Sequence, residues 1–114
     1  MENKELTQDE LEKIKNDVID YKIVEKLADI MKALSEPSRI HIIHALSLSK
    51  MCVTDLSYAL GMTQPLVSHH LRILRNLGLV KYERDGKQLV YSLDDEHVLT
   101  LYEQGLEHAK EKVQ

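Results

Sequence analysis

The sequence predicts a mainly helical fold that contains one small β-hairpin, and three observations support this fold class. The aromatic residues are five tyrosines, with no Trp and no Phe, so the core must be built from Leu, Ile, Val, Ala and Met, a composition that favours helices. Apolar residues recur every three to four positions over most of the chain. The pattern changes at 79–93, where two β-rich runs flank Asp85-Gly86.

Length and composition limit the class of protein. The 114 residues fit one domain of ordinary size, and 43% apolar with 30% charged residues exclude a disordered polyelectrolyte and a membrane protein. The N-terminus is too charged to hold the apolar segment of a signal peptide, so we expect a cytosolic protein. Cys52 is the single cysteine, which excludes an internal disulfide and a tetrathiolate zinc site.

The first two helices are predicted from a cap and from apolar periodicity. Thr7 and Glu10 have the spacing of a capping box, and an apolar stripe at helical spacing follows. We expect an N-terminal helical extension at 1–22 and a second unit at 23–114 that holds the rest of the fold. In that unit the stripe runs to the Ser-Glu before Pro37, which suits the first turn of the next helix.

The central helices are predicted to form the core. Residues 40–48 carry an apolar stripe so wide that the helix should be largely buried. A short helix from Val53 to Leu60 ends at Gly61, and Thr63 caps a further helix with Pro65 in its first turn. The expected inward stripe of this further helix is Leu66, Val67, Leu71, Leu74 and Leu77.

A short helix, a Gly-containing turn and a second helix are the layout of a helix-turn-helix. The β-rich runs Leu79–Arg84 and Lys87–Leu93 predict a hairpin directly after it, because Asp85-Gly86 is typical of a two-residue loop in which both residues have positive φ. Together these elements predict a winged helix-turn-helix. A last amphipathic helix should run from Asp94 to Val113.

The charge distribution points to one surface that faces anions. Residues 61–92 carry five Lys/Arg against two Asp/Glu, whereas residues 93–114 carry two against six, and the whole chain has a net charge of −4. A basic block within an acidic protein is typical of a local nucleic-acid contact. Chance clustering of solvated charge is the alternative.

The outer face of the second helix supplies candidate DNA-binding residues. With its leucine stripe turned inward, it presents side chains that pair with base edges or reach phosphates: Gln64, Ser68, His69, Arg72 and Arg75. Arg84 and Lys87 flank the hairpin tip, where a wing would meet the minor groove or the adjacent backbone. The alternatives are an ordinary exposed or half-buried role for His69 and His70, and a solvated turn for Arg84 and Lys87.

The last helix carries candidate metal ligands. His97 and His108 are eleven residues apart, close to three helical turns, and Glu111 shares their face while Asp95 lies at the helix start. Two imidazoles and two carboxylates suit a tetrahedral zinc ion. The two pairs are about 20 Å apart along the axis, so one ion needs Asp95 and His97 of one chain and His108 and Glu111 of an antiparallel second chain.

The spacing therefore predicts a homodimer with two equal metal sites. The alternative is an exposed polar face on an acidic amphipathic helix. Two other candidates are weaker, because nothing is placed to complete a site with His41 and His44, and Cys52 is better explained as a small buried residue.

Several stretches resemble metal-sensing repressors of the ArsR–SmtB family. They are Leu34 to Ile40, Cys52 to Leu56, Val67 to Leu74 with its Ser-His-His-Leu segment, and Val90 to Val98 with Tyr-Ser-Leu-Asp. The resemblance covers roughly residues 23–112. It implies a cytosolic homodimer that holds double-stranded operator DNA when metal-free and releases it on binding metal.

The resemblance also implies the metal. The pattern Asp-x-His, ten residues, His-x-x-Glu/His of the zinc-sensing members is matched by all four candidate ligands, which implies Zn²⁺ as the regulatory ligand, with Co²⁺, Cd²⁺ or Ni²⁺ as other possibilities. Thr54 stands where the cadmium- and lead-sensing members have the second cysteine of Cys-Val-Cys-Asp-Leu, so a thiolate site at Cys52 is not expected.

The leading hypothesis is thus a zinc-responsive transcriptional repressor. The alternative is a winged-helix protein-interaction module without metal-regulated DNA binding. We do not expect an enzyme, because the sequence shows no nucleophile–base pairing and no Gly-rich phosphate loop, and the expected zinc set leaves no open position for water.

Overall fold

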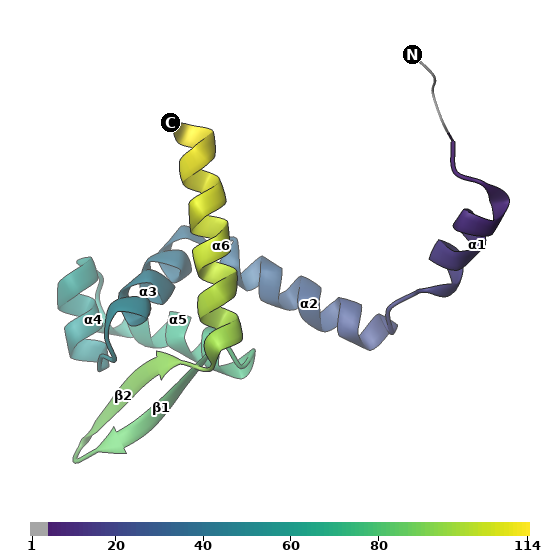
Figure 1. Cartoon of the computed structure of the whole chain (residues 1–114). Helices are drawn as coiled ribbons and strands as arrows, with labels where there is room; N and C mark the ends of the chain where they lie inside the picture. The colour runs from purple at the N-terminus through teal and green to yellow at the C-terminus, as the bar shows by residue number, and fades with distance from the viewer. Residues whose placement is uncertain (1–4) are drawn as a thin grey trace.

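The computed structural model describes residues 5–114, and Figure 1 shows their arrangement as six helices and one hairpin. The elements in chain order are α1 (Gln8–Asn16), α2 (Tyr21–Leu34), α3 (Pro37–Leu48), α4 (Val53–Leu60), α5 (Gln64–Asn76), β1 (Val80–Asp85), β2 (Gln88–Leu93) and α6 (Glu96–Val113). This order confirms the expected mainly helical fold with one hairpin. The first four residues of the expected extension 1–22 lie outside the described residues.

Side-chain caps determine where the first helices begin. The Thr7 hydroxyl accepts a hydrogen bond from the Glu10 backbone N–H at 3.2 Å, and the Glu10 carboxylate accepts one from the Thr7 N–H at 2.9 Å. The expected capping box is therefore present. Asp20 caps α2 by accepting from Lys22 N–H at 2.8 Å, which separates α2 from α1. The apolar stripe that starts in α1 thus spans two helices with a break at 17–20.

The core lies where α3, α4, α5 and the hairpin meet. Its most deeply buried side chains are less than 2% exposed: Ile42, Ile43, Leu56, Val67, Leu71, Leu74 and Val80. The centre of the wide stripe on α3 is buried as expected, but the expected burial does not extend to the ends of that stripe, and the expected inward placing of Leu66 was wrong. Both ends of the stripe on α3 are exposed, with Ile40 at 43% and Leu48 at 73%, and Leu66 of α5 is 42% exposed rather than inward. These positions lie at the edges of stripes whose centres alone face the core.

The hairpin pairs β1 and β2 antiparallel, with Val80 opposite Leu93 and Asp85 opposite Gln88. The connection is therefore Gly86-Lys87, one residue later than expected. Only Gly86 has a positive φ, 64°, so the expectation that both loop residues would have positive φ was wrong. Residue 51, in the connection between α3 and α4, forms two backbone hydrogen bonds with residue 91, at 3.1 and 2.8 Å, which attach the hairpin to the helices.

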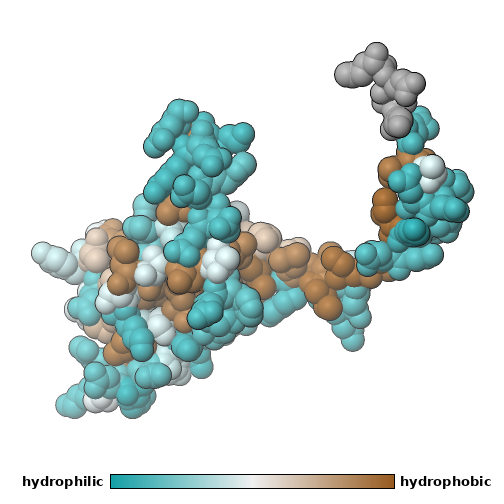
Figure 2. Space-filling model, in the orientation of Figure 1, coloured by the Kyte–Doolittle hydropathy of each residue, from teal (hydrophilic) through white to brown (hydrophobic). Residues whose placement is uncertain are grey.

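Two parts of the chain project from this core. In Figure 1, α1 and the start of α2 extend to one side, and the C-terminal half of α6 rises above α3. Figure 2 shows hydrophobic surface along α2, and no residue of α1 is buried. The described residues extend over 62 × 36 × 21 Å. Within 5–114, no helix is both long enough and apolar enough to cross a lipid bilayer.

Candidate functional site

Helix α5 has one buried and one open face. Gly61, with φ 65°, ends α4 in the left-handed conformation, and the Thr63 hydroxyl accepts from the Leu66 N–H at 3.3 Å to begin α5. The core-facing side chains of α5 are Val67, His70, Leu71 and Leu74. The five side chains expected to read DNA are all exposed: Gln64, Ser68, His69, Arg72 and Arg75.

His70 faces the interior rather than the open face of α5. It is 6% exposed, and its Nδ1 accepts a hydrogen bond from Arg39 Nε at 3.2 Å. Its Nε2 lies 3.7 Å from a carboxylate oxygen of Glu36. Burial lowers the pKa of the His70 imidazole, and the carboxylate of Glu36 opposes that shift only in part. His70 is therefore more deeply buried than the exposed or half-buried position considered for it, and it does not lie on the open face of α5.

Glu36 and Arg39 fix α5 on the start of α3, a role that sequence reasoning missed. The Glu36 carboxylate accepts from the Arg39 backbone N–H at 3.2 Å, and an Arg39 guanidinium nitrogen lies 3.5 Å from the Ala33 carbonyl oxygen. The same guanidinium bonds His70. The signal in the sequence was His70 itself, because a buried imidazole requires polar partners.

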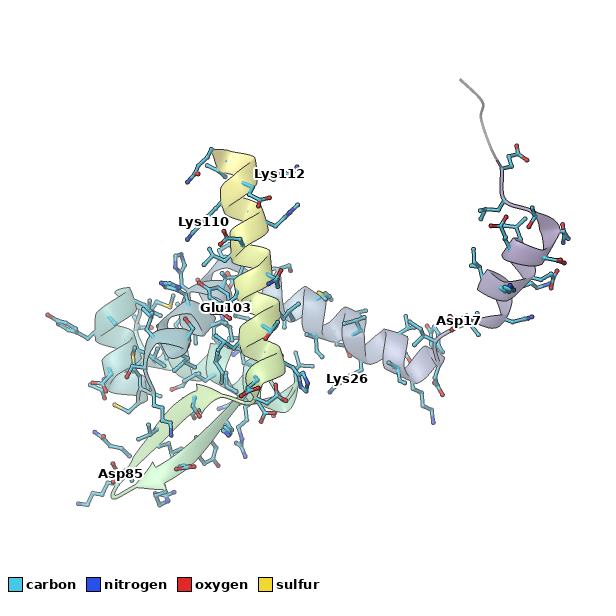
Figure 3. All side chains as sticks on the ribbon, in the orientation of Figure 1. Asp17, Lys26, Asp85, Glu103, Lys110 and Lys112 are labelled. Atoms are coloured by element: carbon cyan, nitrogen blue, oxygen red, sulfur yellow. The ribbon has the colours of Figure 1, made fainter. Side chains whose placement is uncertain are left out.

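The hairpin carries the two expected wing residues at its free end. Arg84 and Lys87 are both exposed, beside Asp85, which Figure 3 labels at the tip. Arg75, at the end of α5, is exposed and also contacts the hairpin. Its guanidinium lies 4.4 Å from the centre of the Tyr82 ring in β1, a cation–π contact that links α5 to the hairpin.

The metal candidates lie at opposite ends of α6. Asp95 caps the helix by accepting from the Val98 N–H at 3.1 Å, and its second oxygen lies 3.4 Å from His97 Nδ1. The Val98 hydrogen bond lowers the pKa of the Asp95 carboxyl, so it stays ionised. His108 and Glu111 are exposed near the C-terminus.

The donors fit zinc in kind, but not within one chain. Two imidazoles and two carboxylates are ligands that zinc accepts. In the described part of the chain, no three His, Cys, Asp or Glu side chains are placed to hold one ion. The structure brings Asp95 and His97 together and leaves His108 and Glu111 apart from them, as the helical spacing requires.

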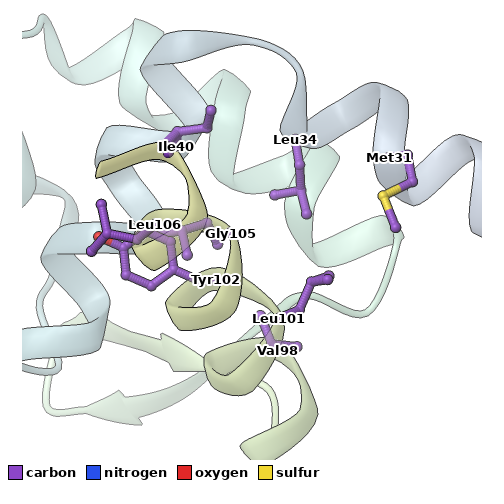
Figure 4. A pocket seen from close by; sticks show the side chains of 10 residues that line it. Met31, Leu34, Ile40, Val98, Leu101, Tyr102, Gly105 and Leu106 are labelled. Carbon is purple, nitrogen blue, oxygen red and sulfur yellow. The ribbon is translucent and has the colours of Figure 1, made fainter. Parts of the chain in front are cut away.

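An apolar groove of about 330 Å³ runs between α2, α3 and α6. Figure 4 shows several of its side chains, which point into the space between these helices. Among its lining residues are Met31, Leu34, Ile40, Leu101, Gly105 and Ala109. Helix α2 also exposes apolar side chains outside the groove, such as Ile23 and Leu27.

The remaining candidates take other places. His41 and His44 of α3 are both exposed, and His44 is hydrogen-bonded through Nδ1 to the Tyr102 hydroxyl of α6. Cys52 is 8% exposed at the N-cap of α4, as expected for a small buried residue.

Comparison with known proteins identifies the family. A family model described as "Bacterial regulatory protein, arsR family" matches residues 36–82, which run from the start of α3 into β1. The chain is 37% identical over 103 residues to the "Transcriptional repressor SmtB homolog" of Synechocystis sp., covering 90% of this chain and 78% of that protein. The chain belongs to the arsR family of bacterial regulatory proteins.

Two further similarities extend the comparison of this arsR-family chain. The "Cadmium resistance transcriptional regulatory protein CadC homolog" of Staphylococcus aureus is 44% identical over 86 residues, with 75% of this chain and 71% of that protein covered. The solution structure of a homodimeric winged helix-turn-helix DNA-binding domain from Mycobacterium bovis is similar with a TM-score of 0.79 at 26% identity, covering 82% of this chain and 87% of that one.

These similarities establish two features of the arsR-family chain. It has the winged helix-turn-helix fold, in which α4 and α5 form the helix-turn-helix and β1 and β2 form the wing. It is a regulatory protein and not an enzyme, since its family and relatives are transcriptional regulators.

Proposed function

We propose that this arsR-family chain is a transcriptional repressor that binds operator DNA as a metal-free homodimer and is released when zinc binds between its two α6 helices. The observation that carries the proposal is the division of α5. Its apolar side chains and His70 are buried, while Gln64, Ser68 and His69 are exposed together near its start. In a helix-turn-helix, the first turns of the second helix are the part that meets base edges.

The chemistry of the open face suits DNA. Gln64 can pair with adenine through two hydrogen bonds, and Ser68 and His69 can donate to or accept from base edges. Arg72 and the wing residues Arg84 and Lys87 supply positive charge for phosphates, which fix position rather than sequence. The relatives named as transcriptional regulators support this interpretation.

The proposed zinc site requires a second copy of the chain. The two ligand pairs lie about 20 Å apart on α6, further than one ion can bridge. If two α6 helices pack antiparallel, Asp95 and His97 of one chain meet His108 and Glu111 of its partner. The homodimeric relative from Mycobacterium bovis supports this assembly, and so does the apolar groove beside α6, which a second chain would cover.

Regulation follows from linkage between the two ligands. The dimer releases DNA on zinc binding only if its DNA-free conformation holds zinc more tightly than its DNA-bound conformation does. DNA must then lower the affinity for zinc by the same factor. A cadmium-resistance regulator among the relatives supports metal as the signal, and the nitrogen and oxygen donors of α6 favour zinc over a softer ion.

A binding titration tests the proposal. The probe is a fluorescent duplex from the promoter of the chain's own gene, titrated with protein in a chelator and then in excess zinc. We expect tight binding in chelator that weakens steeply with added salt, as released counterions require, and release by zinc. Cys52→Ser should still release DNA. A DNA affinity that changes with neither salt nor zinc would favour the protein-interaction alternative.

Mixed dimers test the geometry of the metal site. One chain carries Asp95→Ala and His97→Ala, and the other carries His108→Ala and Glu111→Ala. In the antiparallel arrangement the mixed dimer keeps one complete site, so we expect one zinc per dimer by metal titration. Two zinc ions bound with unweakened affinity would contradict the shared site.

A further inference from the structure

We propose that the hydrogen bond between Tyr102 and His44 is the contact through which zinc binding at α6 is communicated to the DNA-reading helix α5. The inference rests on the proposed zinc-regulated function and assigns residues to its regulation. Tyr102 and His44 are positioning residues in this scheme, since neither touches the metal or the DNA.

The contact joins two helices that have few polar links. The Tyr102 hydroxyl on α6 and His44 Nδ1 on α3 are hydrogen-bonded, with their ring centres 5.8 Å apart and inclined at 53°. Burial raises the pKa of the Tyr102 phenol, with a smaller contribution from the charge of Glu103, so the hydroxyl keeps its proton and is able to donate a hydrogen bond to His44 Nδ1. Over residues 5–114, this is the one side-chain hydrogen bond between α6 and another element.

Tyr102 occupies the middle of the proposed metal-binding helix. His97 lies five residues before it and His108 six residues after it. In the proposed antiparallel dimer, His97 of each chain lies beside His108 of the other chain. The two-fold axis then passes close to the midpoint between positions 97 and 108, beside Tyr102. Zinc bound at both ends fixes how the two α6 helices cross. Tyr102 therefore lies where a change in the crossing angle of the two α6 helices would change how α6 packs against α3.

Helix α3 connects this contact to α5. Five residues before His44, Arg39 donates from Nε to His70 Nδ1 of α5 at 3.2 Å. Between them, Ile42 and Ile43 are 0% and 1% exposed, which anchors α3 in the core. A displacement of α3 at His44 is thus passed on as a displacement at Arg39, because a packed helix moves as a unit. His70 and the base-reading side chains share one helix, so the movement reaches the DNA-binding face.

The position of the contact at the surface suits a switch. His44 is exposed and Tyr102 half-buried, so water can replace either partner and the bond can break without stranding a buried polar group. A hydrogen bond of this kind changes an equilibrium by about two- to twelvefold. That is the contribution we assign to it within the total effect of zinc on DNA affinity.

The test measures a coupling factor, which is the ratio of the DNA dissociation constants with and without zinc. Tyr102→Phe removes the hydroxyl and keeps the ring, and His44→Gln is an independent second variant. We expect either change to reduce the coupling factor by about two- to twelvefold, and the double variant to reduce it no further. Affinity for zinc alone and for DNA alone should stay within about twofold of the unmodified protein.

His41→Gln is the matched control. His41 lies one turn before His44 on the same helix, is exposed, and makes no side-chain hydrogen bond in the described part of the chain. We expect this variant to keep the full coupling factor. A loss equal to that of His44→Gln would show that the effect belongs to α3 in general, and would overturn the assignment.

A second readout needs no metal. In the zinc-free protein, nitrogen-15 NMR of the His44 ring should show Nδ1 as an acceptor and Nε2 as the protonated nitrogen, and Tyr102→Phe should abolish this preference. If the unmodified protein stays bound to DNA in excess zinc although the NMR signature is present, the proposed zinc-regulated function is wrong, and the proposed role of the hydrogen bond is wrong as well. If zinc releases DNA from Tyr102→Phe as completely as from the unmodified protein, this inference alone is wrong.

Discussion

The winged helix-turn-helix body, made of α3, α4, α5, β1 and β2, and the helices that project from it differ in how many side chains they bury. Within the body, Leu56, Leu71 and Leu74 are completely inaccessible to solvent. In α6 the one buried residue is Val98, and α1 buries none. The body therefore completes its own core within a single chain, whereas α6 leaves apolar surface beside a groove. We infer that reading DNA uses a structure each chain makes alone, and that sensing metal uses one that two chains make together.

Core truncation should separate the two regions most strongly. Leu71→Ala removes a side chain with 0% exposure, and we expect the free energy of unfolding to fall by about 2–5 kcal/mol at every protein concentration. Leu101→Ala removes a groove side chain that is 39% exposed, so its cost should grow with protein concentration as the dimer forms. Urea unfolding at two concentrations measures both. A concentration-independent loss for Leu101→Ala would contradict the comparison.

Changes on the open face of α5 should affect DNA alone. Ser68→Ala and His69→Ala should each weaken binding to the operator by about 1–3 kcal/mol, because each would remove a proposed base contact. Zinc affinity and dimerisation should not change, since both residues are exposed on the body and far in sequence from α6. Fluorescence anisotropy and zinc titration on the same preparations give the answer. Loss of zinc binding would show that the two regions are not separate.

The wing should contribute less than α5 to DNA affinity, and its contribution should not depend on the DNA sequence. Arg84→Ala or Lys87→Ala should weaken binding to all duplexes alike and reduce the slope of log affinity against log salt by roughly one unit for each lost phosphate contact. Lys26→Ala is the matched control, because Lys26 is an exposed cation on α2, away from the wing in Figure 3. An unchanged slope in both wing variants would place the wing away from DNA.

The smallest effect we expect is a pH dependence of the body, because it comes from one group. Burial lowers the pKa of folded His70 below its ordinary value of 6.5. Below pH 6.5 the unfolded chain gains a proton that the folded chain resists, so the free energy of unfolding falls as the pH drops toward the folded pKa. Above pH 6.5 both states are neutral and the dependence ends. Urea unfolding from pH 7.5 to 5 should show this slope, and His70→Asn should remove it.

Much of the fold could be predicted from the sequence because its signals are local. The Thr7–Glu10 capping box and the left-handed Gly61 each depend on a few neighbouring residues, and the structure contains both. Predictions at the edges of a stripe were less accurate. Leu66 is apolar and correctly spaced, yet it is exposed, because periodicity gives the direction of the buried face and not its width.

Contacts between distant segments could not be predicted. Arg39 and His70 are 31 residues apart, and His44 and Tyr102 are 58 apart. Nothing in the local pattern pairs these residues, because the pairing depends on how the helices cross. The metal ligands show the opposite case. Helical rise alone separates the two pairs on α6, so the need for a second chain follows from the spacing of the residues, while the site itself stays a prediction.

Arg75 lies over Tyr82, and Tyr82 packs against Tyr91 with ring centres 5.5 Å apart, so the end of α5 contacts a hairpin whose two strands are packed together. If α5 and the wing enter neighbouring grooves as proposed, the distance between those grooves is then set by the folded chain. Each added base pair lengthens the duplex by about 3.4 Å and rotates it. We therefore expect an operator with one base pair inserted between these grooves to retain all its contacted bases and still bind poorly.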